Sequence, residues 1–215
     1  AYDELGIEPI YVYPPHLYKE KSMPEKFSKK LKEVLNKIEQ FDYSLISHSR
    51  HQWKRPSTLS KKEFSSISKN NDWLIKGFSA YLEISKKNPI LILFEYGIDY
   101  QDTKSLIHDL KIQDNVYWLP LMKRKEILEV INACDVGIGE FYEDNITMGS
   151  TGYEILTLEK PLIQGPLDSN EFTKITKIPR PPGIFVSTPK EIKNAFLSLE
   201  DDNYRKSLGS EGLKW

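Results

Sequence analysis

One five-residue run constrains the fold of this chain more than any other feature. The run Ile90-Leu91-Ile92-Leu93-Phe94 is apolar at every position. A strand with one face in solvent alternates apolar and polar residues, so an unbroken apolar run indicates a strand that is covered on both faces. Such strands are typical of parallel sheets, because the crossover connections place helices on both faces. The run therefore predicts an α/β fold.

The rest of the chain alternates short apolar runs with amphipathic stretches. We expect strands near 43–47, 90–94, 115–119, 136–139, 161–163 and 184–186. We expect helices near 27–38, 70–82, 102–110, 123–132, 150–158 and 189–199. A repeated strand-then-helix order implies right-handed crossovers and parallel pairing. The predicted fold class is α/β: a doubly wound, Rossmann-like parallel sheet with helices on both faces.

Charge and cysteine content exclude several function classes. Thirty Lys and Arg residues against 31 Asp and Glu residues leave a net charge of −1, so a uniformly basic surface for nucleic acid is missing. The single cysteine, Cys134, excludes an intramolecular disulfide and suits a reducing compartment. No apolar run approaches the roughly 20 residues that span a bilayer. We therefore expect a cytoplasmic protein with no membrane span.

The first candidate loop follows the predicted strand 43–47. It is basic from His48 to Lys62, with no acid before Glu63. Open parallel sheets bind ligands outside the carboxyl ends of their strands, so this loop is well placed. Arg50 offers a planar fork to phosphate oxygens, and Lys76 in the next helix offers a second positive charge. A solvated basic loop is an equally plausible alternative.

The second candidate loop ends at a predicted helix start. The sequence from Met148 to Glu154 places two glycines around Ser-Thr, which lets backbone N–H groups approach an anion such as phosphate. Glu154 lies one turn into the helix, where it can accept hydrogen bonds from ribose hydroxyls. An ordinary helix cap and a first-turn acid that stabilises the helix dipole are the alternatives. We expect Glu140, Glu143 and Asp144 to form a solvated loop.

A third loop and one histidine pair complete the candidates. The loop Leu119-Pro120-Leu121-Met122 follows a predicted strand, where it can flank a base or simply pack. His48 and His51 are three residues apart, but no cysteine and no other nearby histidine completes a set of metal ligands. We therefore expect no metal site.

Taken together, these residues resemble the C-terminal, donor-binding domain of retaining GT-B glycosyltransferases of family 4. The resemblance covers about residue 44 to the C-terminus. It is carried, in chain order, by His48-Ser49-Arg50, Lys76-Gly77, Leu91-Ile92-Leu93, Tyr96-Gly97, Asn115–Pro120, Ala133-Cys134-Asp135-Val136, Gly149, Glu154, Lys160-Pro161-Leu162-Ile163 and Tyr204–Gly209.

The resemblance implies a role for each candidate residue. Arg50 and Lys76 would hold the donor diphosphate, and Glu154 would bind the ribose. The residues expected against the phosphates are Gly149, Ser150, Thr151 and Gly152, and those expected beside the base are Leu119, Pro120, Leu121 and Met122. The sequence departs from the family at Ile146, where a glutamate near the donor sugar is usual, and at Glu159-Lys160, where a glycine is characteristic. No catalytic residue is identified.

The implied activity is retaining transfer of a sugar from a nucleotide diphosphate to an acceptor hydroxyl, in polysaccharide or glycoconjugate synthesis. It needs no cofactor and no metal. Residues 1–40 would be a linker and leading helix from a preceding domain, and residues 41–215 the nucleotide-sugar-binding domain. A missing N-terminal domain would bind an acceptor glycan or lipid-linked glycan, so this fragment would be inactive alone, and that domain would allow peripheral membrane association. The alternatives are a nucleotide-sugar 2-epimerase and a non-catalytic nucleotide-sugar-binding domain.

Overall fold

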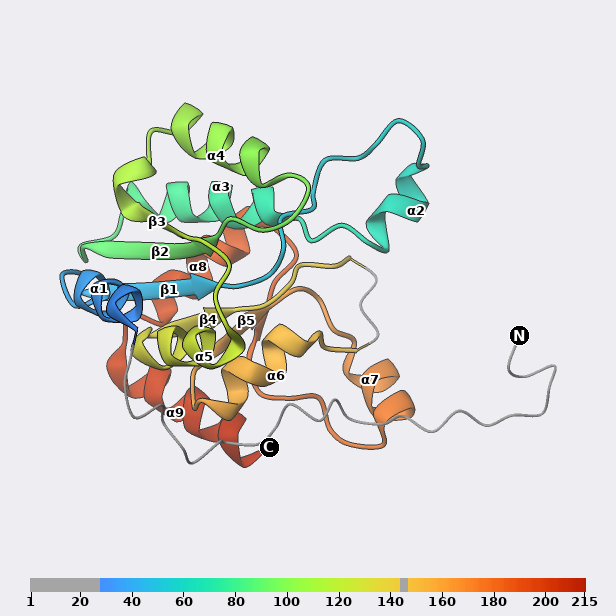
Figure 1. Ribbon diagram of the computed structural model, residues 1–215. Helices are drawn as coiled ribbons and strands as arrows, with labels where there is room; N and C mark the ends of the chain where they lie inside the picture. The colour runs from blue at the N-terminus through green and yellow to red at the C-terminus, as the bar shows by residue number, and fades with distance from the viewer. Residues whose placement is uncertain (1–27, 144–146) are drawn as a thin grey trace.

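Six parallel strands form one sheet in the order β3-β2-β1-β4-β5-β6 (Figure 1). The structure is a computed structural model, and it describes residues 28–143 and 147–215. The strands are β1 (Tyr43–Ser47), β2 (Pro89–Phe94), β3 (Val116–Leu119), β4 (Val136–Ile138), β5 (Leu162–Gln164) and β6 (Ile184–Phe185). All six expected strands are present, and the predicted doubly wound α/β class is confirmed.

Helices cover both faces of the sheet (Figure 1). On one face α3 packs against α4 and α8, and on the other α1 packs against α5, beside α6. The helices are α1 (Lys29–Ile38), α2 (Lys61–Ser65), α3 (Asn71–Leu82), α4 (Tyr100–Asp109), α5 (Arg124–Ala133), α6 (Ser150–Thr157), α7 (Ser169–Thr176), α8 (Pro189–Ser198) and α9 (Asp202–Lys214).

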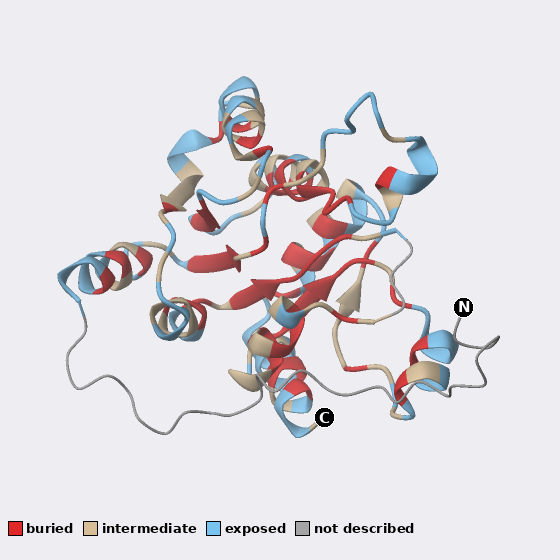
Figure 2. Cartoon of the chain, turned by 45° about the vertical axis from the view of Figure 1, so that its right-hand side comes forward, coloured by how far each residue is buried: buried red, intermediate tan, exposed pale blue. Residues whose placement is uncertain are grey.

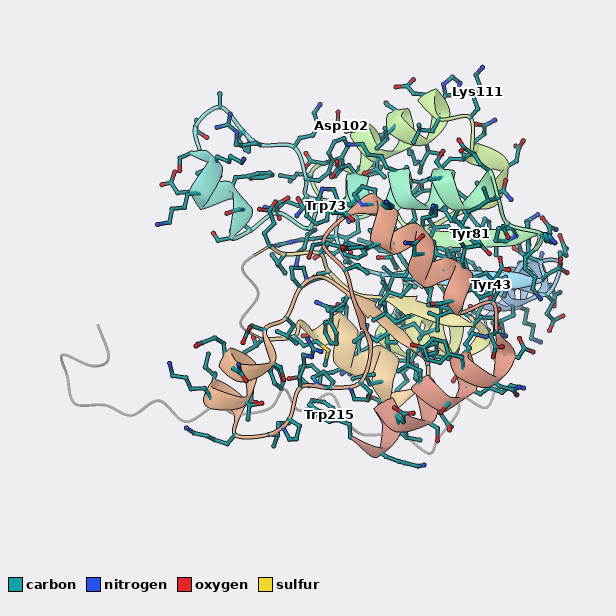
Figure 3. All side chains as sticks on the ribbon, turned by 180° about the vertical axis from the view of Figure 1, so that it is seen from behind. Tyr43, Trp73, Tyr81, Asp102, Lys111 and Trp215 are labelled. Carbon is teal, nitrogen blue, oxygen red and sulfur yellow. The ribbon has the colours of Figure 1, made fainter. Side chains whose placement is uncertain are left out.

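The apolar run that predicted the fold is buried along its whole length. Every residue of β2 and of β1 is buried. Figure 2 shows that buried residues concentrate in the strands and on the helix sides that face them. Aromatic rings fill the layer under α3 and α8, where Tyr81 lies 6.2 Å from Tyr43 and 5.5 Å from Phe196 between ring centroids (Figure 3). Burial on both faces of β1 and β2 is the main stabilising feature of the sheet.

Helix α1 shares the core of the sheet. Leu31 and Val34 are buried in the same cluster as Val130 of α5. The Ser28 hydroxyl also donates a hydrogen bond of 2.7 Å to the Glu126 carboxylate at the start of α5. The helix expected to lead in from a preceding domain therefore packs as part of this one. The assignment of residues 1–40 stays a prediction, and residues 1–27 lie outside the described residues.

Helix α9 contains Tyr204–Gly209, which carry part of the resemblance, whereas two other helices were anticipated neither by the sequence pattern nor by the resemblance. Helix α2 interrupts the basic loop, and it begins with a capping box in which Ser60 and Glu63 each bond the other's backbone N–H. Helix α7 is capped by Asp168, whose carboxylate accepts from Asn170 N and Glu171 N at 2.8 Å. Both starts carry ordinary capping side chains. The charge of the first segment and the prolines after the second obscured them.

Close packing of α6 on the sheet depends on one glycine. A Cβ added at Gly137 in β4 would lie 2.4 Å from a side-chain carbon of Ile155. Only a residue without a side chain therefore allows α6 to approach this strand so closely. The approach fixes the position of α6, and with it the position of the predicted glycine-containing helix start.

We predict that Ile92→Ala, in the fully buried strand β2, lowers the free energy of unfolding by about 2–5 kcal/mol, because transfer and cavity costs add. The matched change Ile84→Ala, at a side chain that is half exposed after α3, should stay within about 0.5 kcal/mol of wild type. Urea unfolding of both variants measures the difference. Equal losses would contradict the assignment of β2 to the core.

Candidate functional site

The chain reverses its winding direction between β1 and β4, which are neighbours at the centre of the sheet. From β1 the chain continues to β2 on one side, and from β4 it continues to β5 on the other. The two loops diverge at the carboxyl edge, and this is where open α/β sheets form their ligand crevice. The first and second candidate loops are these two loops. The fold therefore brings the basic segment near Arg50 to the glycine-containing start of α6.

Glu154 of α6 is the point at which three segments meet. Its carboxylate bonds His48 Nε2 at 2.8 Å, at the end of β1, and accepts from Arg124 Nε at 2.9 Å, at the start of α5. Burial alone would raise the pKa of Glu154, but the hydrogen bonds from His48 and Arg124, together with the Arg124 charge, hold that pKa below its usual value. Because Arg124 follows loop 119–122 closely, the loop predicted to flank a base lies near the carboxylate predicted to bind ribose.

The start of α6 presents uncapped backbone groups. Gly149 is its N-cap residue, and no described side chain caps the first turn. The first N–H groups of a helix lack partners inside the helix, and the helix dipole adds partial positive charge there. Thr151 Oγ1 is buried and has no hydrogen-bond partner in the part of the chain that the structure describes. This arrangement can bind an anion.

A buried ion pair lies against this helix start. Lys69 Nζ donates to the Glu140 carboxylate and to the Tyr142 hydroxyl. A Cβ added at Gly149 would lie 2.6 Å from Glu140 Oε2, which places this carboxylate beside the N-cap of α6. The expectation that Glu140 belongs to a solvated loop is wrong, because Glu140 is only 8% exposed. Pairing with Lys69 makes that burial possible.

Sequence reasoning missed Lys69, which is 5% exposed at the start of α3. The next residue, Asn70, has φ 44° and ψ 43°, a left-handed conformation that turns the chain into the helix. The Asn70 side chain donates to Phe141 O at 2.7 Å, so this turn is tied to the loop after β4. The signal in the sequence was Asn70, because asparagine adopts positive φ more readily than most residues and so indicates a sharp turn directly after Lys69.

The other predicted residues occupy different environments around the crevice. The Arg50 side chain is exposed, and within residues 28–143 and 147–215 its guanidinium has no hydrogen bond or ion pair. Lys76 is exposed in the second turn of α3 and pairs with Asp72 at 2.7 Å. Leu119 is buried, whereas Leu121 is 68% exposed. Ile146 lies outside the described residues. The binding roles of all these residues stay predictions.

The segment that follows Arg50 is anchored to the loop after β2. His51 N donates to Tyr96 O at 2.7 Å, and the Asp99 carboxylate accepts from Trp53 N at 2.6 Å and Lys54 N at 2.8 Å. Lys54 Nζ reaches Asp102, labelled in Figure 3, at 2.6 Å. The His51 ring is enclosed, with Nδ1 3.1 Å from Thr103 Oγ1, and burial lowers the pKa of His51 to about 4. These contacts fix the backbone that carries Arg50.

Comparison with known proteins supports the fold. No family model matches the chain, and no curated protein matches its sequence. Similar solved structures include a single-residue mutant of S. aureus TarM in complex with fondaparinux, alpha-GlcNAc-glycerol and UDP, with a TM-score of 0.65, 12% identity, and 99% of this chain aligned to 37% of that one.

Two further similar structures also contain UDP. The pneumococcal O-GlcNAc transferase GtfA in complex with UDP and GlcNAc has a TM-score of 0.56 and 16% identity over 80% of this chain and 32% of that chain. Anabaena HepE in complex with UDP and glucose has a TM-score of 0.59 and 13% identity over 88% of this chain and 47% of that chain. The neighbours are GT-B glycosyltransferases, and at these identities the likeness shows a shared fold. This chain spans between 32% and 47% of their lengths.

No helix among the described residues is long and apolar enough to cross a bilayer.

The pKa of His51 predicts a pH-dependent stability. As pH falls below 6.5, the unfolded chain protonates this histidine while the folded chain keeps it neutral until about pH 4. Stability is therefore lost on acidification, by about 2 kcal/mol from this group between pH 6.5 and 5. Urea unfolding of wild type and His51→Gln at both pH values measures the change. The variant should lose about 2 kcal/mol less than wild type over this window, and parallel losses would contradict the prediction.

Proposed function

We propose that residues 41–215 form the nucleotide-sugar-binding domain of a retaining, family 4-like glycosyltransferase. One observation carries the proposal: the buried Lys69–Glu140 pair lies against the start of α6, which no described side chain caps, at the edge where the sheet reverses its winding. The fold is that of glycosyltransferases solved with UDP, which favours a nucleoside diphosphate over other anions. A role in polysaccharide or glycoconjugate synthesis, in the cytoplasm, completes the proposal.

The diphosphate is assigned to the N-terminus of α6. The residues Gly149, Ser150, Thr151 and Gly152 would approach the phosphates through the backbone and the Thr151 hydroxyl. Arg50 would supply a fork of donors from the loop after β1. Two lysines are candidates for the remaining charge. Lys69 lies beside Gly149 through its partner Glu140, whereas Lys76 lies further along α3 in a surface ion pair, so the geometry favours Lys69.

The nucleoside is assigned to the other side of the same helix. Glu154 would accept hydrogen bonds from the ribose, and loop 119–122 would flank the base. The contact between Arg124 and Glu154 supports a common location for these two parts. Exposed Leu121 and half-buried Met122 offer apolar surface to a base.

Transfer would proceed by departure of the diphosphate from the sugar. Negative charge then grows on the phosphate oxygens, and preorganised cations and helix N–H groups stabilise it most in the transition state. In the proposed mechanism Lys69, Arg50 and α6 supply that stabilisation, with no metal and no cofactor. The acceptor hydroxyl of a glycan or lipid-linked glycan would be bound by a further domain.

We predict that the double variant Lys69→Met/Glu140→Gln weakens UDP binding by about 1.5–3 kcal/mol, or roughly 10–150-fold, because a charged donor to the diphosphate is lost. Removing both charges avoids leaving a buried, unpaired carboxylate. Calorimetry with UDP and UMP measures the effect, which should be smaller for UMP. Glu140→Gln alone is the control for the loss of the partner.

Lys76→Met tests the alternative lysine in the same experiment. We expect its affinity for UDP to stay within about threefold of wild type, because it removes only an exposed ion pair. A large loss in Lys76→Met together with none in the double variant would instead assign the diphosphate to Lys76. Equal affinities in all variants would contradict a diphosphate site here.

We predict that this 215-residue chain binds a nucleotide diphosphate but transfers no sugar, because transfer needs donor and acceptor held together with water excluded. The assay incubates the chain with UDP-sugars and acceptor glycans, beside a longer protein that also carries the proposed acceptor-binding domain. Transfer by the isolated chain would show that its site is complete. Release of a free epimerised sugar would support an epimerase, and tight binding without turnover in the longer protein would support a non-catalytic binding domain.

A further inference from the structure

His48 and Arg124 hold Glu154 in different ways. The His48 side chain is 6% exposed and the Glu154 side chain 12%, whereas that of Arg124 is 50% exposed. His48 extends from the end of β1, a strand in which every residue is buried. The imidazole contact is therefore enclosed by the core, whereas the guanidinium contact lies at the surface. An exposed ion pair contributes little free energy and exchanges readily for another hydrogen-bond partner.

The second nitrogen of His48 identifies which ring nitrogen carries the proton. His48 Nδ1 is buried and has no hydrogen-bond partner in the described part of the chain. A proton on Nδ1 would be a buried donor without an acceptor, which is unfavourable. A proton on Nε2 can be donated to Glu154 Oε2 across the observed 2.8 Å. The neutral imidazole that fits this environment is therefore the Nε2–H tautomer.

We propose that His48 is a positioning residue that fixes the Glu154 carboxylate for a ribose. Its Nε2–H holds Oε2 in place, and the Oε1 atom that now accepts from Arg124 becomes available to ribose hydroxyls when Arg124 moves away. The inference rests on the proposed function, because it takes the ligand to be a nucleoside diphosphate. It adds a buried histidine as the determinant of how strongly the ribose hydroxyls are recognised.

Two variants at one position test the role of this hydrogen bond. His48→Gln places an amide nitrogen near the position of Nε2 and can still reach Glu154, whereas His48→Asn places its amide near the position of Nδ1 and is too short. His108→Asn, at an exposed histidine in the last turn of α4, is the matched control. Calorimetry measures the dissociation constants of UDP and of 2′,3′-dideoxyuridine diphosphate for each protein, and thermal unfolding confirms that each is folded.

The readout is the ratio of the two dissociation constants, which reports the ribose hydroxyls alone. In wild type and His108→Asn we expect UDP to bind about tenfold or more tightly than the dideoxy analogue, the scale of hydrogen bonds to a carboxylate. His48→Gln should keep this ratio within about threefold of the wild-type ratio, and His48→Asn should bring the ratio close to one. A structural role alone would weaken both ligands equally and leave the ratio unchanged.

The outcomes separate this inference from the proposed function. If wild type binds UDP with the expected ratio and His48→Asn keeps that ratio, the positioning role is overturned while the nucleotide site stands. If wild type binds UDP and the dideoxy analogue equally, Glu154 does not bind ribose, and the role of His48 is overturned as well. If wild type binds neither ligand, the proposed function itself fails.

Discussion

The pairing of β1 with β4 is the constraint on which the site depends. Leu45, Ile46 and Ser47 lie opposite Val136, Gly137 and Ile138. Asp135, directly before β4, accepts hydrogen bonds of 2.8 Å from both the backbone N and the hydroxyl of Ser44, which fixes this register. A slip of one residue would turn every side chain of one strand to the opposite face. Asp135 therefore helps to fix the position of the loop that carries His48 relative to the helix that carries Glu154.

Carboxylates are buried at the crevice beside a hydrogen-bond partner. Lys69 pairs with Glu140, and His48 with Glu154, on neighbouring sides of the start of α6. Desolvation offsets much of what a buried pair gains by attraction, so such pairs are weak evidence for stability. They do hold side chains in defined places before any ligand arrives, which reduces the ordering that binding requires. Arg50, which has no partner among the described residues, is the contrasting case of a charge left in solvent.

The fold was predictable from the sequence because a strand buried on both faces leaves an unbroken apolar run, as in β2. The helices between the strands leave amphipathic stretches, in which apolar residues recur at helical spacing. Arg50 and Glu154 could be singled out from the sequence because Arg50 follows a strand end and Glu154 follows a glycine-containing helix start, and their binding roles stay predictions. Lys69 and Glu140 were missed because burial of a charge depends on a partner 71 residues away, which no local pattern reveals. Glu159 illustrates the reverse: where the resemblance led us to expect glycine, it has φ 59°, so the fold keeps the left-handed turn without glycine.

The contact between Gly137 and Ile155 has a consequence for protein engineering. Even alanine at position 137 would make its methyl group overlap the side chain of Ile155 in α6. The distance between β4 and α6 therefore cannot be adjusted in small steps by substitution at this position. In a library that varies this layer, a larger residue at position 137 would be accepted only if α6 moved away from the strand. Each such change would displace the Glu154 carboxylate. New ligand preferences are therefore more accessible at Leu121, which is 68% exposed in loop 119–122 and can be exchanged without repacking this layer.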